Sequence, residues 1–278
     1  MATLRAGLIG ANIQRTRLPR ALETCCELTG NSLTFELIDT QGRGGFDFTA
    51  KVRELAAQGW TGVSVTHPWK TGAAAFAAEM VGAPARLGAS NLLLFEADRV
   101  SARNTDYSGF LGAWKSRRDN AKPGRVAMAG AGGVARALAV ALVELGAQDL
   151  ALWDLDPASA IALAETVGAP ARAVATEEAA AAVRAADGLV NATPLGMTPY
   201  PGMAFAAEDI GGQAWAFDAV YTPIETDFLR LAARQDLAVI SGFDLFVHMA
   251  VDTFAAYSGI ALDSETAVER LRPLAEGL

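Results

Sequence analysis

The sequence predicts an α/β protein of two domains. Its 278 residues exceed the length of one average domain. Short apolar runs of β-forming residues alternate with longer helical runs in two series, an order that builds parallel sheets. A polar stretch that contains both Pro and Gly, "RDNAKPG" at residues 118–124, separates the two series. A new structural unit therefore begins after it.

The first series predicts three pairs of a strand and a helix, followed by a hairpin. The pairs are, in order, "RAGLIG" with a helix from Leu18 to Leu28, "LTFELID" with a helix from Phe48 to Gln58, and "GVSVTHP" with a helical stretch through Met80. This order predicts a parallel sheet. In "NLLLFEADRVSARNTD" two strand-like pieces flank the turn-forming "EADR", so we expect a β-hairpin ending at Asn104, Thr105 and Asp106.

The second series begins at the apolar run "RVAMA". It continues with a helix from Val134 to Leu145, a strand in "DLALWDLD", a helix from Ala158 to Val167, an alanine-rich helix around Glu178 to Ala186, and strands in "GLVNATP", "AWAFDAVY" and "LAVISG". The alanine content of 158–186 indicates helix propensity rather than low complexity. We therefore expect a second α/β domain.

The stretch "GAGGVAR", residues 130–136, lies between the first strand and the first helix of this second series. Gly130 permits a tight turn there, and Gly132 lets the backbone approach a pyrophosphate at the helix N-terminus. The following strand ends in Asp154, at the spacing from which a carboxylate accepts a hydrogen bond from an adenosine ribose. Strand, glycines, helix and acid together favour a Rossmann-type dinucleotide site over a turn without a ligand. The predicted loop comprises Gly130, Ala131, Gly132, Gly133 and Val134.

Two acidic residues in "WDLDP" bear on which dinucleotide is bound. Asp154 and Asp156 stand where an NADP site needs an arginine for the 2′-phosphate, and carboxylates would repel that group. NAD is therefore the expected cofactor, with NADP as the second choice. For Asp156, which precedes Pro157, the alternative is an N-cap of the next helix, and the sequence leaves both roles open.

Composition excludes several classes of partner. A formal charge of −8 argues against nucleic acid, whose binders carry a basic face. No apolar run reaches the ~20 residues of a membrane span. The adjacent Cys25 and Cys26 make poor disulfide partners, which fits a reducing, cytoplasmic setting, and no cysteine-histidine or acidic cluster has metal-ligand spacing. A small molecule is the expected ligand.

Polar groups follow several predicted strands, where ligands collect in a parallel sheet. They lie in "VTHPWK", "GASN", "NTD", "NATPLGM" and "DAVYTP". Taken together and in this order, with "GLIG" before them and "AVDTF" after, these motifs resemble the shikimate and quinate dehydrogenase family. The resemblance runs through nearly the whole chain.

The resemblance implies a substrate domain of residues 1–106 and 242–278, completed by C-terminal helices, with a Rossmann domain of residues 107–241 between them. It implies hydride transfer between a nicotinamide cofactor and a shikimate- or quinate-like acid, as in the shikimate pathway of aromatic amino-acid biosynthesis, by a monomer or homodimer. Lys70 and Asp106 match the catalytic pair, and an alcohol that loses a hydride must also lose a proton. The implied substrate residues are Thr16, Thr66, Asn91, Tyr221 and Met249. The further implied cofactor residues are Asn191, Thr193, Gly196, Met197, Val220 and Gly242.

The sequence departs from the family's pattern at two positions. Leu18 stands in place of the second carboxylate-binding hydroxyl, beside Arg15 and Arg17, either of which could receive a carboxylate. Met249 stands in place of a glutamine, so that an apolar thioether replaces a hydrogen-bonding amide. We therefore expect an altered substrate pocket. His67 and His248 are expected to be structural rather than acid or base groups.

Two alternatives stay open. The chain could be a dehydrogenase of a related hydroxy acid, or a dinucleotide-binding module with little turnover. Against the module, Lys70, Asn91 and Asp106 form a set that a protein without chemistry has no physical need to keep.

Overall fold

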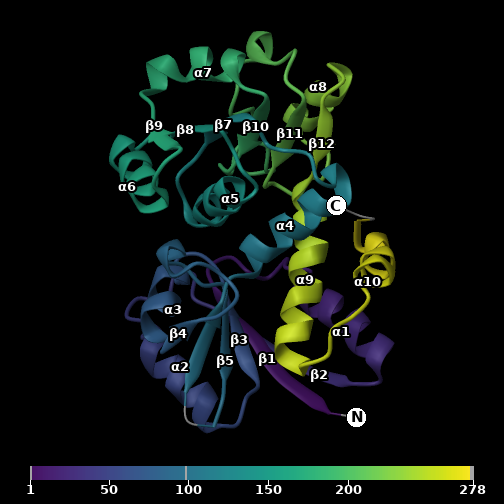
Figure 1. The fold of residues 1–278 in the computed structure, drawn as a ribbon. Helices are drawn as coiled ribbons and strands as arrows, with labels where there is room; N and C mark the ends of the chain where they lie inside the picture. Colours follow the sequence, from purple (N-terminus) through teal and green to yellow (C-terminus); the bar gives the residue numbers. More distant parts are fainter. Residues whose placement is uncertain (1, 98, 276–278) are drawn as a thin grey trace. The chain divides into compact units, whose positions relative to one another are not determined.

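The computed structural model describes residues 2–97 and 99–275 (Figure 1). These residues form two compact units. The first consists of the chain up to Gly109 together with Val247–Leu274, and the second consists mainly of Phe110–Phe246. The boundaries fall inside two helices, α4 (Thr105–Arg118) and α9 (Gly242–Ser258).

The first unit contains a six-stranded mixed sheet in the order β2-β1-β3-β5-β6-β4. Strands β1, β2 and β3 are parallel, whereas β5 runs antiparallel to both β3 and β6. The elements that belong to this unit alone are β1 (Thr3–Gly10), α1 (Leu18–Thr29), β2 (Ser32–Asp39), α2 (Phe48–Ala57), β3 (Gly62–Val65), α3 (Lys70–Phe76), β4 (Glu79–Met80), β5 (Leu92–Phe95), β6 (Val100–Arg103) and α10 (Ser264–Leu271).

The hairpin expected before Asn104 is confirmed. Strands β5 and β6 pair antiparallel, and the backbone N–H of Glu96 donates to the carbonyl of Arg99 across the turn. The helix expected to continue through Met80 was wrong, because α3 ends at Phe76 and residues 79–80 form β4. Strand β4 pairs in parallel with β6. Glu79 and Met80 therefore provide hydrogen-bond partners for the outer edge of β6, which would otherwise be unpaired.

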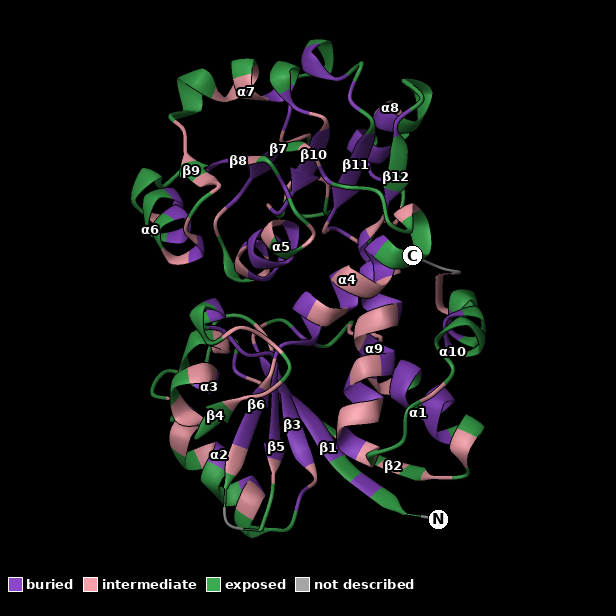
Figure 2. Ribbon diagram, viewed as in Figure 1, coloured by how far each residue is buried: buried purple, intermediate pink, exposed green. Residues whose placement is uncertain are grey.

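Helices cover both faces of the first sheet. On one face, Ile9, Val63 and Leu93 of the central strands pack with Val52 of α2 and Ala73 of α3. Figure 2 shows that β1, β3 and β5 are largely buried.

The C-terminal segment completes the other side of this unit. Tyr257 of α9 is buried, and its hydroxyl lies 2.9 Å from the Oγ of Ser64 in β3. Helix α10 packs against α1.

The second unit contains a six-stranded parallel sheet in the order β12-β11-β10-β7-β8-β9. This is the order of a doubly wound dinucleotide-binding sheet. Its elements are β7 (Arg125–Ala129), α5 (Gly133–Glu144), β8 (Asp149–Trp153), α6 (Pro157–Val167), β9 (Ala171–Ala173), α7 (Ala179–Ala185), β10 (Gly188–Asn191), β11 (Trp215–Asp218), α8 (Asp227–Arg234) and β12 (Ala238–Ile240). The short 3₁₀ helices of the described chain are Ala85–Leu87, Thr176–Glu178, Ala207–Asp209 and Arg272–Ala275.

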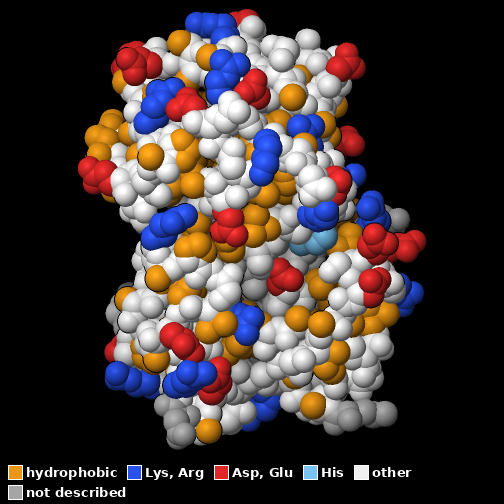
Figure 3. All heavy atoms as spheres, viewed as in Figure 1, with side chains coloured by type: hydrophobic (Ala, Val, Ile, Leu, Met, Phe, Trp, Pro, Cys, Tyr) orange, Lys and Arg blue, Asp and Glu red, His pale blue; other side chains and the backbone are white. Residues whose placement is uncertain are grey.

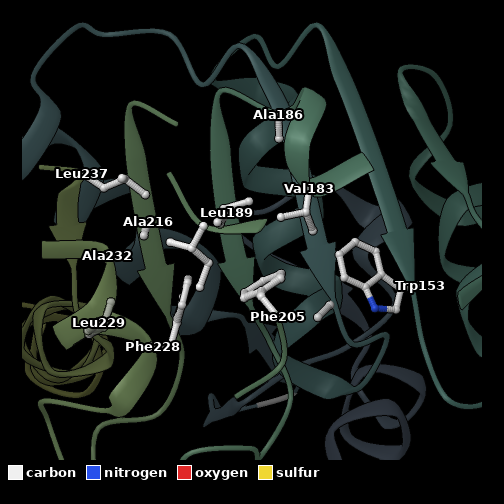
Figure 4. Close-up of a cluster of buried hydrophobic side chains, with 13 residues drawn as sticks. Trp153, Val183, Ala186, Leu189, Phe205, Ala216, Phe228, Leu229, Ala232 and Leu237 are labelled. Atoms are coloured by element: carbon white, nitrogen blue, oxygen red, sulfur yellow. The ribbon is translucent and has the colours of Figure 1, made fainter. Parts of the chain in front are cut away.

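Alternate residues of the second sheet face opposite sides, as the period of a strand requires. Leu189 and Ala216 pack with Val183 of α7 and Phe228 of α8 in one hydrophobic cluster (Figure 4). Figure 1 shows α5 and α6 on the other side of this row of strands. The central strands are therefore buried on both faces, which explains their continuous apolar sequences.

The register of this sheet aligns the ends of four strands. Ala129 of β7 is opposite both Trp153 of β8 and Asn191 of β10, and Asn191 is opposite Asp218 of β11. The loops that follow these residues emerge at the same carboxyl edge. The chain connections reverse between β7 and β10, which is where ligands bind in such sheets.

No helix in the described part of the chain is long and apolar enough to cross a membrane. On the face drawn in Figure 3, acidic and basic side chains are interspersed rather than gathered into one basic patch.

Candidate active site

Lys70 and Asp106 form an ion pair in the first unit. The Nζ of Lys70 donates to the Oδ2 of Asp106 at 2.5 Å, and the two side chains are 14% and 8% exposed. Lys70 begins α3, and Asp106 lies in the first turn of α4, where the helix dipole favours a carboxylate. Limited water access strengthens the attraction between the two charges. The sequence motifs that predicted this pair are 36 residues apart along the chain, and the fold brings them together.

Asn91 is held beside this pair by its backbone and its side chain. Its carbonyl accepts from Val65 at the end of β3, and the adjacent Ser90 N–H donates to the carbonyl of Lys70. Its Oδ1 accepts from the backbone N–H and the Oγ1 of Thr105, at 2.7 and 3.2 Å. Because its oxygen is engaged, Asn91 presents its Nδ2 group as a donor.

Two neighbouring residues that sequence reasoning did not assign fix this arrangement. Asn104 caps α4: its Oδ1 accepts from Tyr107 N–H at 3.0 Å while its Nδ2 donates to the carbonyl of Ala89. The hydroxyl of Thr105 also lies 3.1 Å from that of Thr253 in α9. The signal was present in "NTD", since Asn and Thr often begin helices, but their partners lie far away in sequence.

Thr66 and Thr16 lie on loops that follow strands of the same sheet. Thr66 comes directly after β3, is half-buried, and its backbone N–H donates to the carbonyl of Ile9. The Oγ1 of Thr16 accepts from the backbone N–H of Leu18 at 3.3 Å. Thr66 therefore lies at the edge that carries Lys70 and Asn91, whereas Thr16 is partly engaged at the start of α1.

The residues that depart from the family's pattern occupy different environments. Leu18 is buried in α1 at 5% exposure. Arg17 donates to the carbonyl of Leu274, while Arg15 is exposed. Met249 is half-buried on α9, one helical turn before Thr253 and hence on the same side of that helix.

The two histidines are also placed by the fold. His67 is exposed after β3, and His248 is half-buried on α9. No group of three or more potential metal-binding side chains occurs among the described residues.

The glycine loop of the second unit has the geometry that a pyrophosphate needs. Gly130 has φ of 101°, and a Cβ there would meet the backbone of Ala192 at 2.8 Å. Gly132 precedes α5, and no atom lies within 4 Å of the position that a Cβ would take. The N–H groups of Gly133 and Val134 lie in the first turn of α5, where backbone donors have no partner within the helix.

The two acids after β8 have different roles in the structure. Asp154 Oδ2 accepts from the N–H of Ala131 at 2.7 Å, so this carboxylate lies directly beside the glycine loop. Asp156 caps α6, accepting from Ala158 N–H and from Ser159 Oγ. The hydrogen bond from Ser159, followed by that from Ala158, lowers the pKa of Asp156. Asp156 is therefore engaged by the helix, whereas Asp154, whose Oδ1 also accepts from the N–H of Asp156 at 3.0 Å, lies against the glycine loop.

Asn191 organises the loop after β10. Its Oδ1 accepts from the N–H and the hydroxyl of Thr193, at 3.0 and 2.7 Å, while its Nδ2 donates to Leu195 and Asp218. Farther along, Gly196 N–H donates to the carbonyl of Tyr200, and Met197 is 36% exposed.

The segment after β11 meets the start of α9. Val220 N–H donates to Asp218 Oδ1 at 2.9 Å, and the ring of Tyr221 stacks on Phe246 with centroids 5.4 Å apart. A Cβ on Gly242 would lie 2.6 Å from the carbonyl oxygen of Val220, so a glycine is needed for this approach. Asn191 and Val220 thus both donate to Asp218, a residue that the sequence analysis did not assign. The motif "DAVYTP" contains it, but its burial could not be read from the sequence.

The second unit therefore fits a dinucleotide. At one edge of its sheet lie the features that such a ligand needs. They are a glycine with free space around it, the N-terminus of α5, an acid after the second strand, and a polar loop where the strand order reverses.

Comparisons with known proteins identify relatives over nearly the whole chain. Residues 8–93 match the family described as shikimate dehydrogenase substrate binding domain. The chain is 34% identical to the quinate/shikimate dehydrogenase (NAD(+)) of Corynebacterium glutamicum strain R, over 96% of this chain and 95% of that protein. It is 32% identical to the shikimate dehydrogenase (NADP(+)) of Pseudarthrobacter chlorophenolicus, over 93% of this chain and 91% of that protein.

A solved structure agrees with these sequence relatives. The quinate dehydrogenase of Corynebacterium glutamicum in complex with NAD superposes with a TM-score of 0.91 at 32% identity, covering 98% of this chain and 100% of that chain. This chain therefore belongs to the quinate/shikimate dehydrogenase family of NAD(P)-dependent oxidoreductases.

Proposed function

We propose that this enzyme catalyses the reversible, NAD-dependent oxidation of a ring hydroxyl of quinate or shikimate. The observation that carries the proposal is the shielded Lys70–Asp106 ion pair, with the donor group of Asn91 beside it. A binding module without turnover has no need of such a pair. Family membership supports the dehydrogenase over that alternative.

The residues around the ion pair of the first unit, together with Tyr221 of the second, have proposed roles in this chemistry. NAD, when bound, accepts the hydride from the alcohol carbon. Lys70 exchanges a proton with the reacting hydroxyl at its Nζ, as a general acid or base does. Asp106 holds that Nζ in place and offsets its charge, while Asn91 donates its Nδ2 to a substrate hydroxyl. Thr16, Thr66 and Tyr221 are the proposed further substrate contacts.

The cofactor residues are proposed in the second unit. The loop Gly130–Val134 binds the pyrophosphate, Asp154 accepts from the adenosine ribose, and Asn191–Met197 with Val220 and Gly242 lie along the nicotinamide. Asp154 supports a preference for NAD, because a carboxylate repels the extra phosphate of NADP.

Met249 supports an altered substrate preference. A substrate hydroxyl that faces a thioether loses a hydrogen-bond partner, at a cost of about 1–3 kcal/mol. We therefore expect a high KM for shikimate, and a lower one in Met249→Gln with Leu18→Ser.

The two cysteines bear on the cellular setting of the enzyme. Cys25 and Cys26 are buried and free, which supports a cytoplasmic enzyme. We propose that it acts on a small molecule as a monomer or homodimer.

Steady-state assays of NAD and NADP reduction with quinate, shikimate and related hydroxy acids test the activity. We expect quinate or shikimate to be oxidised, with a higher kcat/KM for NAD. No reduction with either acid would refute the proposal.

Replacing the proposed acid-base residue tests its role. Lys70→Ala should lower kcat by about 10²–10⁴-fold with little change in NAD affinity. Lys51→Ala is the matched control, since it removes a lysine of the same unit that pairs with Glu54 on α2 rather than with Asp106. Turnover of Lys70→Ala at the level of that control would show that the role is wrong.

A further inference from the structure

Asp218 is a fully buried carboxylate at the end of β11 whose oxygens are all engaged. Its Oδ1 accepts from Asn191 Nδ2 and Val220 N–H, each at 2.9 Å, and its Oδ2 accepts from Thr226 Oγ1 at 2.6 Å. All three donors are uncharged. The buried carboxylate of Asp218 therefore accepts three hydrogen bonds in the second unit, all from neutral groups.

The negative charge of this group has no partner among the described residues of the unit. Burial raises the pKa of Asp218 to about 6, against the lowering effect of its three hydrogen bonds, and no cation contributes. The acids nearest in sequence are Asp209, Glu225 and Asp227. Asp209 pairs with Arg184, Asp227 pairs with Arg230, and Glu225 is exposed. Above that pH the site therefore carries an uncompensated buried charge, which proteins normally pair.

Most of these contacts do not depend on the charge of the group. An asparagine at position 218 would accept from Asn191 and Val220 through its oxygen and donate to Thr226 through its nitrogen. The hydroxyl of Thr226 is able to accept as well as donate. A neutral side chain of the same shape therefore keeps one hydrogen bond to each of these three neighbours, although the hydroxyl proton of Thr226, which already accepts from Leu229 N–H, then loses its acceptor. These contacts alone do not account for the charge.

The position of Asp218 suggests a reason for the charge. Its two donors on Oδ1 are Asn191, the last residue of β10, which also bonds to the loop that follows, and Val220 in the segment after β11. Both are proposed to lie along the nicotinamide. The oxidised nicotinamide ring carries a positive charge, whereas the reduced ring is neutral. The pyrophosphate and ribose groups are the same in both forms.

We propose that the Asp218 carboxylate is the counter-charge for the oxidised nicotinamide ring, so that the enzyme binds NAD⁺ more tightly than it would without this charge while NADH gains nothing. The inference rests on the proposed function, because it takes the loop after β10 as the nicotinamide site. It assigns Asp218 to cofactor discrimination, acting through space rather than by contact.

Binding measurements with both cofactor forms test the inference. The full-length parent and Asp218→Asn are titrated with NAD⁺ and with NADH by calorimetry at about pH 8, and thermal unfolding checks that both are folded. We expect Asp218→Asn to raise the Kd for NAD⁺ about tenfold, with the Kd for NADH unchanged. Asp227→Asn is the matched control, because it removes an equal charge from an exposed position nine residues along the same segment and should change neither Kd.

Two results would overturn the inference while the proposed function stands. If the parent and Asp218→Asn have the same Kd for NAD⁺ and the same Kd for NADH, the carboxylate does not interact with the nicotinamide charge. An equal loss for NAD⁺ and NADH would show that Asp218 holds the loop and nothing more. A parent that binds neither form would contradict the proposed function itself.

A second measurement covers the case in which Asp218→Asn does not fold. In the parent, the ratio of the NAD⁺ and NADH dissociation constants is followed from about pH 5 to 8. Protonation of Asp218 removes its charge, so the ratio should rise as the pH falls through about 6. A flat ratio would overturn the inference.

Discussion

Single hydrogen bonds decide which way the amide of Asn91 points. The oxygen of Asn91 faces Thr105, so its nitrogen is left for a ligand. The hydroxyl of Thr105 is in turn placed by Thr253. If Asn91 contacts the substrate as proposed, both threonines affect substrate binding without touching it.

Thr105→Val should therefore weaken substrate binding. Loss of one hydroxyl bond to Asn91 costs about 1 kcal/mol, so we expect a roughly fivefold higher KM for the substrate with a smaller change in kcat. The measurement is steady-state kinetics with NAD in excess. Thr105→Ser keeps the hydroxyl and serves as the control, and a valine variant with the serine variant's KM would refute this positioning role.

Asp218 should also leave a signature in the pH dependence of stability. Burial raises its pKa in the folded chain from 3.8 to about 6, so the native state binds the proton more tightly than the unfolded state. Its contribution is fully present below about pH 4 and is lost as the pH rises through 6, a loss of about 3 kcal/mol in the free energy of unfolding.

Urea unfolding of the parent and Asp218→Asn at several pH values measures this contribution. We expect the difference in unfolding free energy between them to shift in favour of the asparagine variant as the pH rises from 4 to 7. A difference that does not depend on pH would mean that the carboxylate does not titrate in this range.

At the scale of elements, the turn between β7 and α5 contains two glycines that are needed for different reasons. Gly130 is needed by the fold, because a side chain there would meet Ala192 and the backbone has a positive φ. Gly132 has open space and an ordinary φ of −77°. Packing therefore does not require a glycine at this position, whereas the proposed pyrophosphate contact does.

Gly132→Ala should accordingly lose cofactor binding without losing stability. We expect an unchanged Tm but at least a tenfold higher Kd for NADH, since the methyl group blocks the approach of the pyrophosphate. Gly130→Ala is the contrast, and it should lower Tm as well. Normal NADH binding by Gly132→Ala would place the pyrophosphate elsewhere.

Local sequence predicted the elements that carry their own signals. The glycine turn, the strand–helix order and the β5–β6 hairpin were recognisable because turn residues and apolar runs lie next to each other. The end of α3 was not, because alanines favour a helix while the pairing of β4 with β6 is decided by a distant strand. Asp156 was ambiguous until its bonds to Ala158 and Ser159 were seen.

The candidate site was predicted by residue type but not by environment. Lys70 and Asp106 were expected as a pair, and the structure joins them. That Asp218 is buried without a counter-charge depends on neighbours from three separate segments, which no pattern in the chain specifies.

At the scale of the whole molecule, the two units differ in how the chain builds them. The second consists mainly of one continuous segment, Phe110–Phe246. In its core, Phe110 and Trp114 of α4 meet Phe217 and Trp215 edge to face. The first needs the C-terminal segment, whose Tyr257 reaches Ser64.

Fragments of the chain should therefore behave differently. A fragment of residues 105–246 should unfold cooperatively and retain measurable NADH binding, because it contains the complete parallel sheet. A fragment of residues 1–109 should show no cooperative transition, since the sheet face that α9 covers is left open. Circular dichroism during heating distinguishes the two, and a disordered 105–246 fragment would contradict this division.

The split of the first unit also sets an order of events on the ribosome. Its strands are synthesised first, yet the segment Val247–Leu274 that completes it is synthesised last. The continuous second unit is finished in between and is free to fold while the nascent chain is still attached. Throughout that interval the first sheet lacks α9, and its apolar face is open to chaperones and to other nascent chains. The part of the enzyme that carries Lys70 is therefore the last to become native, although it is the first to be made.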